Sequence, residues 1–263
     1  MVFFNGKIVT VDDFFSIKQA MAIQGERIAA VGSNEVIQAL VGSETVIVDL
    51  GGRTVVPGLI DNHNHVIRAT EYWPNEARLD GVSSRVEALA KLEAKVSELS
   101  DGEKIVNWLM SLGGWTENQF SGDKSDFTLE ELDELASEKP VFIQSTYDHA
   151  FGNTAWFEEM DIPLQADFAV RSSATGLASY VVRDESGAVT GRLNGGMPMV
   201  VSAIEHFPVV TAVRQEDAIK ETFSYLNSIG LTAVYDPAGA GIKDDSYARI
   251  ESLSADTGLT VRI

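Results

Sequence analysis

After Gly58 the sequence alternates between short apolar segments and amphipathic segments, and this alternation constrains the fold more than any other feature. The amphipathic stretch 84–99 carries Val or Leu at spacings of three and four, which is typical of a helix with one buried face. Five apolar segments of strand length begin near Val55, Lys104, Pro140, Leu231 and Leu259. Alternating strands and helices favour parallel strands covered by helices, so an α/β fold is expected.

Local signals place the ends of several of the expected helices. Thr128 is a suitable N-cap residue, and Glu131 follows three residues later, which is the capping-box pattern. Gly230 stands where the helical pattern 215–229 ends, as glycine often does at a helix C-terminus. A further helical pattern follows near 244–257, and the segment 259–263, "LTVRI", is expected to be the last strand.

The first 54 residues have a different pattern from the rest of the chain. Short β-branched segments are interrupted by Gly and Asp, with hairpin-like turns at Asn5-Gly6 and Gly25-Glu26. One short helix is expected after the N-cap residue Ser33. We therefore expect a small, mostly β domain over residues 1–54. A second domain over 55–263 would carry a hairpin-like insertion near 177–200.

The number of alternating strands limits the architecture of the second domain. A closed (β/α)₈ barrel takes about 250 residues by itself, and only five strands of the alternating kind are identified here. A terminal strand with no helix after it would leave an open sheet edge. Two interpretations stay open at this point: a different open α/β fold, or the first part of a larger barrel.

Composition excludes several classes of function. The net charge of −19 comes without any cluster of Lys and Arg, so neither nucleic acid nor an acidic membrane surface is an expected partner. The longest apolar segments fall short of the ~18 residues that span a membrane. The chain has no cysteine, which excludes disulfides and thiolate metal ligands. The start does not have the pattern of a signal peptide, so a cytoplasmic location is expected.

Two of the four histidines stand together in the segment "VVPGLIDNHNH", residues 55–65. Residues i and i+2 of a strand point to the same side, so His63 and His65 would project together, roughly 7 Å apart. Two imidazoles in that arrangement can bind one divalent metal ion. A pair of hydrogen-bonded surface histidines is the alternative. The apolar strand, the Pro-Gly pair and Asp61 before the histidines favour the metal site.

The same segment resembles the first-strand motif of the amidohydrolase superfamily, Pro-Gly-x-Ile-Asp-x-His-x-His. Four further segments resemble the amidohydrolase family 3 type, in the expected order: "GGWTENQF", "PVFIQSTYDHAFGNTAWFEEMDI", "GAVTGRLNGG" and "NSIGLTAVYDPAG". The amino-terminal residues resemble the beginning of the small β-sandwich that these enzymes carry. The resemblance implies an incomplete metal-dependent (β/α)₈ TIM-type barrel preceded by part of a β-sandwich.

The resemblance also implies a function, namely hydrolysis of an amide or other C–N bond in a small-molecule substrate by a metal-activated water. It makes His63 and His65 metal ligands, with zinc as the expected ion and one or two ions in the complete enzyme. It makes Trp115 and His149 substrate-binding residues. Asp148 and Asn153 match the family in the segment around His149.

The sequence also departs from the family pattern. The later ligands and the catalytic acid or base are expected beyond residue 263, so a missing carboxy-terminal half or a homo-oligomer is expected to complete the protein. Gly195 stands where relatives usually carry Glu. His206 is expected to be structural, and Asp236 to be a local capping group before Pro237. A non-catalytic remnant or binding module that retains the first half of the fold is the alternative function.

Overall fold

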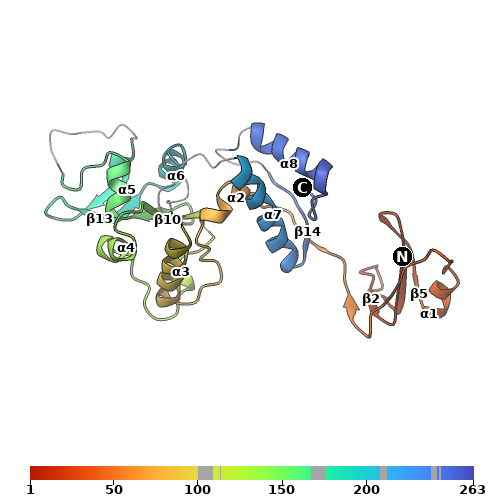
Figure 1. The fold of residues 1–263 in the computed structure, drawn as a ribbon. Helices are drawn as coiled ribbons and strands as arrows, with labels where there is room; N and C mark the ends of the chain where they lie inside the picture. The colour runs from red at the N-terminus through yellow and green to blue at the C-terminus, as the bar shows by residue number, and fades with distance from the viewer. Residues whose placement is uncertain (100–108, 113, 167–175, 208–211, 238–241, 243) are drawn as a thin grey trace. The chain divides into compact units, whose positions relative to one another are not determined.

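The computed structural model describes residues 1–99, 109–112, 114–166, 176–207, 212–237, 242 and 244–263. The chain divides into two compact units. The amino-terminal unit consists of Met1–Asp61 with Gly230–Ala233, and the larger unit consists of Asn62–Ile229 with Val234–Ile263. Each unit is described by itself below (Figure 1).

The amino-terminal unit is built from short strands and one helix. Its first sheet has the order β5-β4-β1-β6, its second has the order β3-β2-β7, and β14 pairs with β8. The elements are β1 (Val2–Phe4), β2 (Lys7–Val9), β3 (Ile17–Lys18), β4 (Ala20–Gln24), β5 (Arg27–Gly32), α1 (Asn34–Gln38), β6 (Ile47–Asp49), β7 (Thr54–Val55), β8 (Leu59–Asp61) and β14 (Leu231–Val234), the last residue of which belongs to the larger unit.

Two of the three local predictions for this unit are confirmed. Gly25 has φ +59° and links β4 to β5 as an antiparallel hairpin. Ser33 caps α1 by accepting a hydrogen bond from the Val36 N–H. The hairpin predicted at Asn5-Gly6 is wrong, because β1 and β2 lie in different sheets. Alternate residues of β1 and β4 instead pack against Ile37 of α1 to form a small core.

The larger unit contains a five-stranded sheet with the order β12-β13-β11-β10-β9. Strands β9 and β10 are parallel, and the other neighbouring pairs are antiparallel. Every residue of β10 and β11 is buried, so these strands lie at the centre of the core. The strands are β9 (Leu109–Leu112), β10 (Val141–Ser145), β11 (His149–Gly152), β12 (Val181–Arg183) and β13 (Val189–Asn194).

Helices α3, α4 and α5, whose bounds are given below, contact this sheet (Figure 1). The capping box at Thr128 is present at the start of α4, as predicted, and Ser84 caps α3. The helices are α2 (Val66–Tyr72), α3 (Arg85–Glu98), α4 (Leu129–Leu135), α5 (Thr154–Glu159), α6 (Gly196–Ile204), α7 (Ala212–Ser228) and α8 (Asp244–Thr257), with 3₁₀ turns η1 (Trp73–Asn75), η3 (Glu117–Gln119) and η4 (Leu177–Tyr180).

Helices α2, α7 and α8 pack against one another. The strand predicted for 259–263 is reduced to a β-bridge at Arg262, whose O accepts a hydrogen bond from Val234 N of β14 at 2.8 Å. None of the helices in the described part of the chain is long and apolar enough to cross a membrane.

The strands expected to belong to a barrel do not form one continuous sheet in the described residues. Strand β9 pairs with β10, whereas β8 pairs with β14. The strand expected near Lys104 is described only from Leu109, because residues 100–108 lie outside the described part. The mixed α/β class is therefore observed, and the incomplete barrel stays a prediction.

Candidate metal and substrate sites

The two histidines of the "DNHNH" segment lie side by side, immediately after β8 and before α2. Their ring centroids are 5.3 Å apart, with the rings edge to face. His65 occupies the N-cap position of α2, but its side chain makes no capping hydrogen bond. The Nδ1 atom of His65 is buried and has no hydrogen-bond partner. A buried ring nitrogen left without a hydrogen bond is uncommon and needs an explanation.

Asp236, which is far from these histidines in the sequence, lies beside His65. Its Oδ1 lies 3.8 Å from His65 Nδ1, and its side chain is only 2% exposed. Its Oδ2 accepts a hydrogen bond from the Ile67 N–H in the first turn of α2, at 2.9 Å. Asp236 is a capping group, as predicted, but the prediction of a local cap is wrong because it caps a helix 169 residues earlier in the chain.

These residues fit a divalent metal ion. Two imidazoles and a carboxylate are a donor set that zinc commonly takes from proteins. The buried His65 Nδ1 has no hydrogen bond that an ion would need to displace. Asp236 could not be assigned from the sequence, since a single acid before a proline has many roles and its partner lies far away in the chain.

His149 lies at the start of β11, opposite Ser145 of β10. Its Nε2 is 2.9 Å from Glu117 Oε1, and its Nδ1 is 3.0 Å from Asp148 Oδ2. Hydrogen bonding to Glu117 raises the pKa of His149 above its usual range, against the opposing effect of burial. Burial would raise the pKa of Glu117, but its hydrogen bond with His149 lowers it below the usual range.

The turn that leads into His149 has a strained backbone. Thr146 has φ +47°, which is rare for a β-branched residue. Such conformations persist only where the surrounding structure holds them, and they are found most often at functional sites. Here the turn is held on both sides: Asp148 O accepts a hydrogen bond from Gly196 N, and the Gln144 side chain donates to Thr146 O.

Trp115, predicted to line the substrate pocket, is 1% exposed. Its ring packs against Phe120 and Phe127, and its Nε1 donates a hydrogen bond to Gln144 O at 2.8 Å. Trp115 therefore anchors the chain just before Glu117 to the end of β10. Glu117 was not identified from the sequence, because nothing in "GGWTENQF" separates it from a surface acid.

Gly195 and His206 are two further residues for which the sequence gives an expectation. A Cβ atom at Gly195 would lie 2.3 Å from the Tyr180 ring and 2.6 Å from Met199 Cβ, so this backbone has no room for a Glu side chain. His206 is exposed just after α6, where its N–H bonds Ala203 O. The structural role expected of it stays a prediction.

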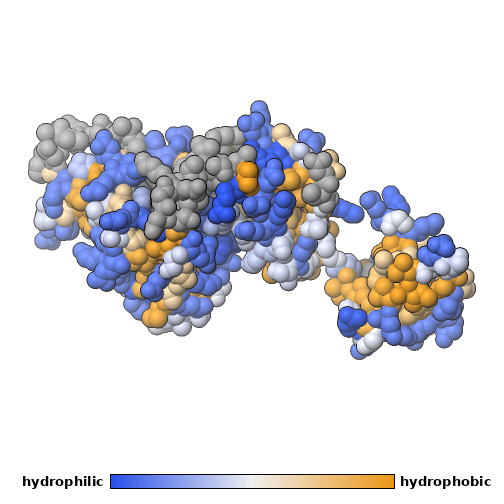
Figure 2. Space-filling model, viewed as in Figure 1, coloured by the Kyte–Doolittle hydropathy of each residue, from blue (hydrophilic) through white to orange (hydrophobic). Residues whose placement is uncertain are grey.

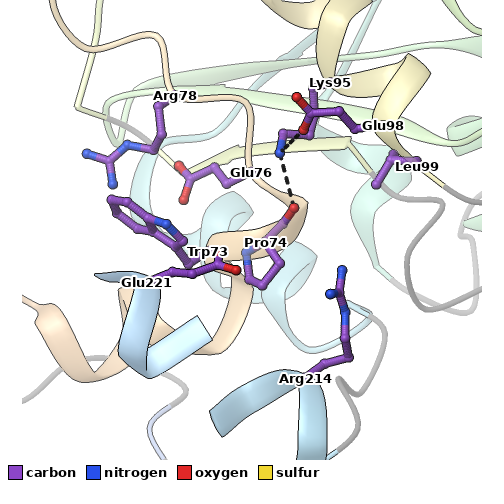
Figure 3. Close-up of a pocket in the computed structure, with 9 residues that line it drawn as sticks. All are labelled: Trp73, Pro74, Glu76, Arg78, Lys95, Glu98, Leu99, Arg214 and Glu221. Carbon is purple, nitrogen blue, oxygen red and sulfur yellow. Dashed lines mark hydrogen bonds and ion pairs between the residues drawn. The ribbon is translucent and has the colours of Figure 1, made fainter. Parts of the chain in front are cut away.

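A hollow of about 450 Å³ lies between η1, α3 and α7 (Figure 3). Three acids and three bases line it together with Trp73, Pro74 and Leu99; the charged residues are Glu76, Arg78, Lys95, Glu98, Arg214 and Glu221. Lys95 Nζ lies 2.7 Å from Glu98 Oε2 and donates to Pro74 O, while the Arg78 guanidinium stacks on the Trp73 ring. None of the histidines lines this hollow. The residues that line this hollow are far apart in the sequence, so no sequence motif predicts it.

Comparison with protein families gives one match over most of the chain. The family model described as "Amidohydrolase family" matches residues 46–263. This range includes both histidines of the "DNHNH" segment, the Glu117–His149 pair and Asp236.

Comparison with individual proteins gives relatives that are longer than this chain. "Protein LONG AFTER FAR-RED 3" of Arabidopsis thaliana is 26% identical over 234 residues, 88% of this chain and 37% of the relative. "N-substituted formamide deformylase" of Arthrobacter pascens is 27% identical over 196 residues, 73% of this chain and 34% of the relative. The chain thus spans little more than a third of the length of these curated relatives.

A solved structure has a similar fold along the whole chain. The crystal structure of an uncharacterized metal-dependent hydrolase from Pyrococcus horikoshii OT3 matches with a TM-score of 0.60 and 20% sequence identity. The match covers 99% of this chain and 47% of the Pyrococcus chain. At this identity the similarity concerns the fold alone.

Proposed function

Because this chain belongs to the amidohydrolase family, we propose that it is part of a metal-dependent hydrolase that cleaves a C–N bond of the amide type. The observation that carries the proposal is the buried Nδ1 of His65, which has no hydrogen bond and lies 3.8 Å from the buried carboxylate of Asp236. An imidazole held in that way is ready to bind a cation. We propose zinc as the ion, held by His63 and His65 with Asp236 beside them.

The residues of this chain would have different roles in this reaction. A divalent ion would supply Lewis acidity and lower the pKa of a water molecule toward neutrality. His63 and His65 would hold the ion, and α2 would keep His65 in place. Asp236 balances charge at His65 and, by capping α2, ties the "DNHNH" segment to the end of β14. The group that takes and returns the proton is proposed to lie outside these 263 residues.

Substrate contacts by Trp115 and His149 stay predictions. Trp115 is buried among aromatic side chains, and both ring nitrogens of His149 are engaged by carboxylates. A substrate that hydrogen-bonds to His149 would have to replace Glu117 or Asp148. Trp115 would therefore affect substrate binding indirectly, because it holds the segment that carries Glu117.

The experiment is a hydrolysis panel on two proteins, the 263-residue chain and the same chain extended to the length of its relatives. The panel contains an N-substituted formamide, N-acyl amino acids and cyclic amides, with added zinc or manganese. We expect the extended protein to hydrolyse at least one of them and the short chain to hydrolyse none. Absence of hydrolysis by the extended, metal-loaded protein would contradict the proposal and favour a binding module.

We also propose that the amino-terminal unit is covered by further protein, either the remainder of the enzyme or a second copy. Figure 2 shows apolar residues over much of the visible face of this unit. Ile28, Ile47 and Ile60 are 65%, 55% and 71% exposed, more than is usual for large apolar side chains gathered in so small a unit. Apolar patches that are exposed to water in this way mark surfaces that bind other proteins.

We therefore expect the isolated 28.5-kDa chain to associate with itself. Size-exclusion chromatography with light scattering should give a mass of at least twice that of the chain. Substituting Ile28 and Ile47 by Thr should reduce the mass, since it removes apolar surface from the two edge strands of the first sheet, β5 and β6, while keeping β-branched side chains. A stable monomer over a range of concentrations would show that the exposed face needs no cover.

A further inference from the structure

We propose that Glu117, Asp126 and His149 form a second cation site that binds one zinc-like divalent ion. The three residues share no member with the proposed site at His63 and His65. Each offers one ligand atom, and these atoms lie within 4.8 Å of one another. Separations of that size allow the three atoms to contact one ion after small side-chain movements.

The donor set selects a class of ion. Imidazole nitrogen is a ligand for zinc and related transition metals, whereas magnesium and calcium prefer oxygen alone. One imidazole and two carboxylates therefore favour zinc, cobalt or manganese over the alkaline-earth ions. His149 and Glu117 are the inner members, 8% exposed and partly buried respectively, while Asp126 is exposed toward solvent, which leaves a path for the ion.

The ligands are held by further groups in the way that metal sites commonly are. Asp148 Oδ2 lies 3.0 Å from His149 Nδ1 and so orients the ring with Nε2 toward Glu117. Ser145 Oγ donates to Glu117 Oε2 at 3.3 Å. Ser145 and Asp148 flank the strained turn at Thr146, so this turn sets the positions of both supporting groups.

The test measures cobalt binding to the full 263-residue chain, stripped of metal with a chelator, by visible absorption and by calorimetry. The background is the double variant His63→Ala/His65→Ala, which removes the other proposed site. We expect this variant to retain one equivalent of Co²⁺ that zinc displaces. In that background, Glu117→Gln or His149→Gln should abolish the absorption. Asp148→Asn should weaken binding about 10- to 100-fold, because it only orients the ring.

Two further variants keep the test decisive. Glu130→Gln, which changes an exposed acid on α4, should bind as the background does. Asp126→Asn changes a ligand that is 48% exposed and outside the core, so it reports on the site even if Glu117→Gln fails to fold. The proposal is overturned if the background variant binds no Co²⁺, or if Asp126→Asn and Glu117→Gln both bind as the background does. Either result would leave Glu117 and His149 as an ion pair that shares a proton.

Discussion

Replacing His63 by Ala in the extended protein is expected to abolish hydrolysis of any substrate that the panel identifies. His63 and His65 are the only imidazoles at the proposed zinc site in the described part of the chain. With one imidazole and one carboxylate the site would hold the ion weakly, since catalytic zinc usually has three protein ligands. Without the ion, the pKa of water returns from about 7 toward 15.7, so we expect a loss of about a thousand-fold or more.

Measured rates and metal content of the same samples check this prediction. His206→Ala is the matched control: it also removes an imidazole, but from an exposed position after α6, so rate and zinc content should stay unchanged. Circular dichroism should show that both variants are folded. If the His63→Ala protein keeps its zinc and its rate, the histidine pair is not the metal site and the proposed function loses its basis.

Replacing Asn153 by Ala is expected to give the largest loss of stability among single changes near the candidate sites. Asn153 is fully buried, and its side chain uses all of its hydrogen-bonding capacity. Its Oδ1 accepts from Val141 N and Trp156 N at 2.9 and 3.0 Å, and its Nδ2 donates to Ala136 O and Lys139 O at 2.6 and 2.9 Å. The Ala variant would remove the side-chain hydrogen bonds that Val141 N in β10 and Ala136 O at the end of α4 make with Asn153, together with the side-chain cap of α5.

An unsatisfied buried group costs about 1–3 kcal/mol, so we expect the free energy of unfolding to fall by about 4 kcal/mol. Urea unfolding followed by tryptophan fluorescence measures the change. Thr128→Ala is the matched control, because Thr128 is also an N-cap but is exposed, and a cap alone contributes about 1 kcal/mol. Equal losses in the two variants would mean that Asn153 acts only as the cap of α5 and does not join the surrounding elements.

Local structure was largely readable from the sequence. Helices α3 and α4 begin at Ser84 and Thr128 because a hydroxyl three positions before a backbone N–H satisfies it within one turn. The hairpin at Gly25 forms because glycine takes a positive φ without strain. The proximity of His63 and His65 also follows from sequence, since two residues separated by one stay neighbours in most conformations. Family membership could be inferred for the same reason: the motif that carries it is continuous.

The contacts that give these residues their environments were decided by tertiary structure. Asp236 looked like a local cap, yet it meets His65 and the start of α2 because β14 ends beside the segment that follows β8. Glu117 and His149 are 32 residues apart and meet because β11 turns back antiparallel along β10. The "LTVRI" segment has a strand-like composition but forms a β-bridge at Arg262 in place of a strand in the described residues, since a strand needs a neighbour along its length. Residue type and spacing determined which chemistry was available to this chain, whereas long-range strand pairing decided which side chains meet, because such pairing depends on the packing of the whole unit.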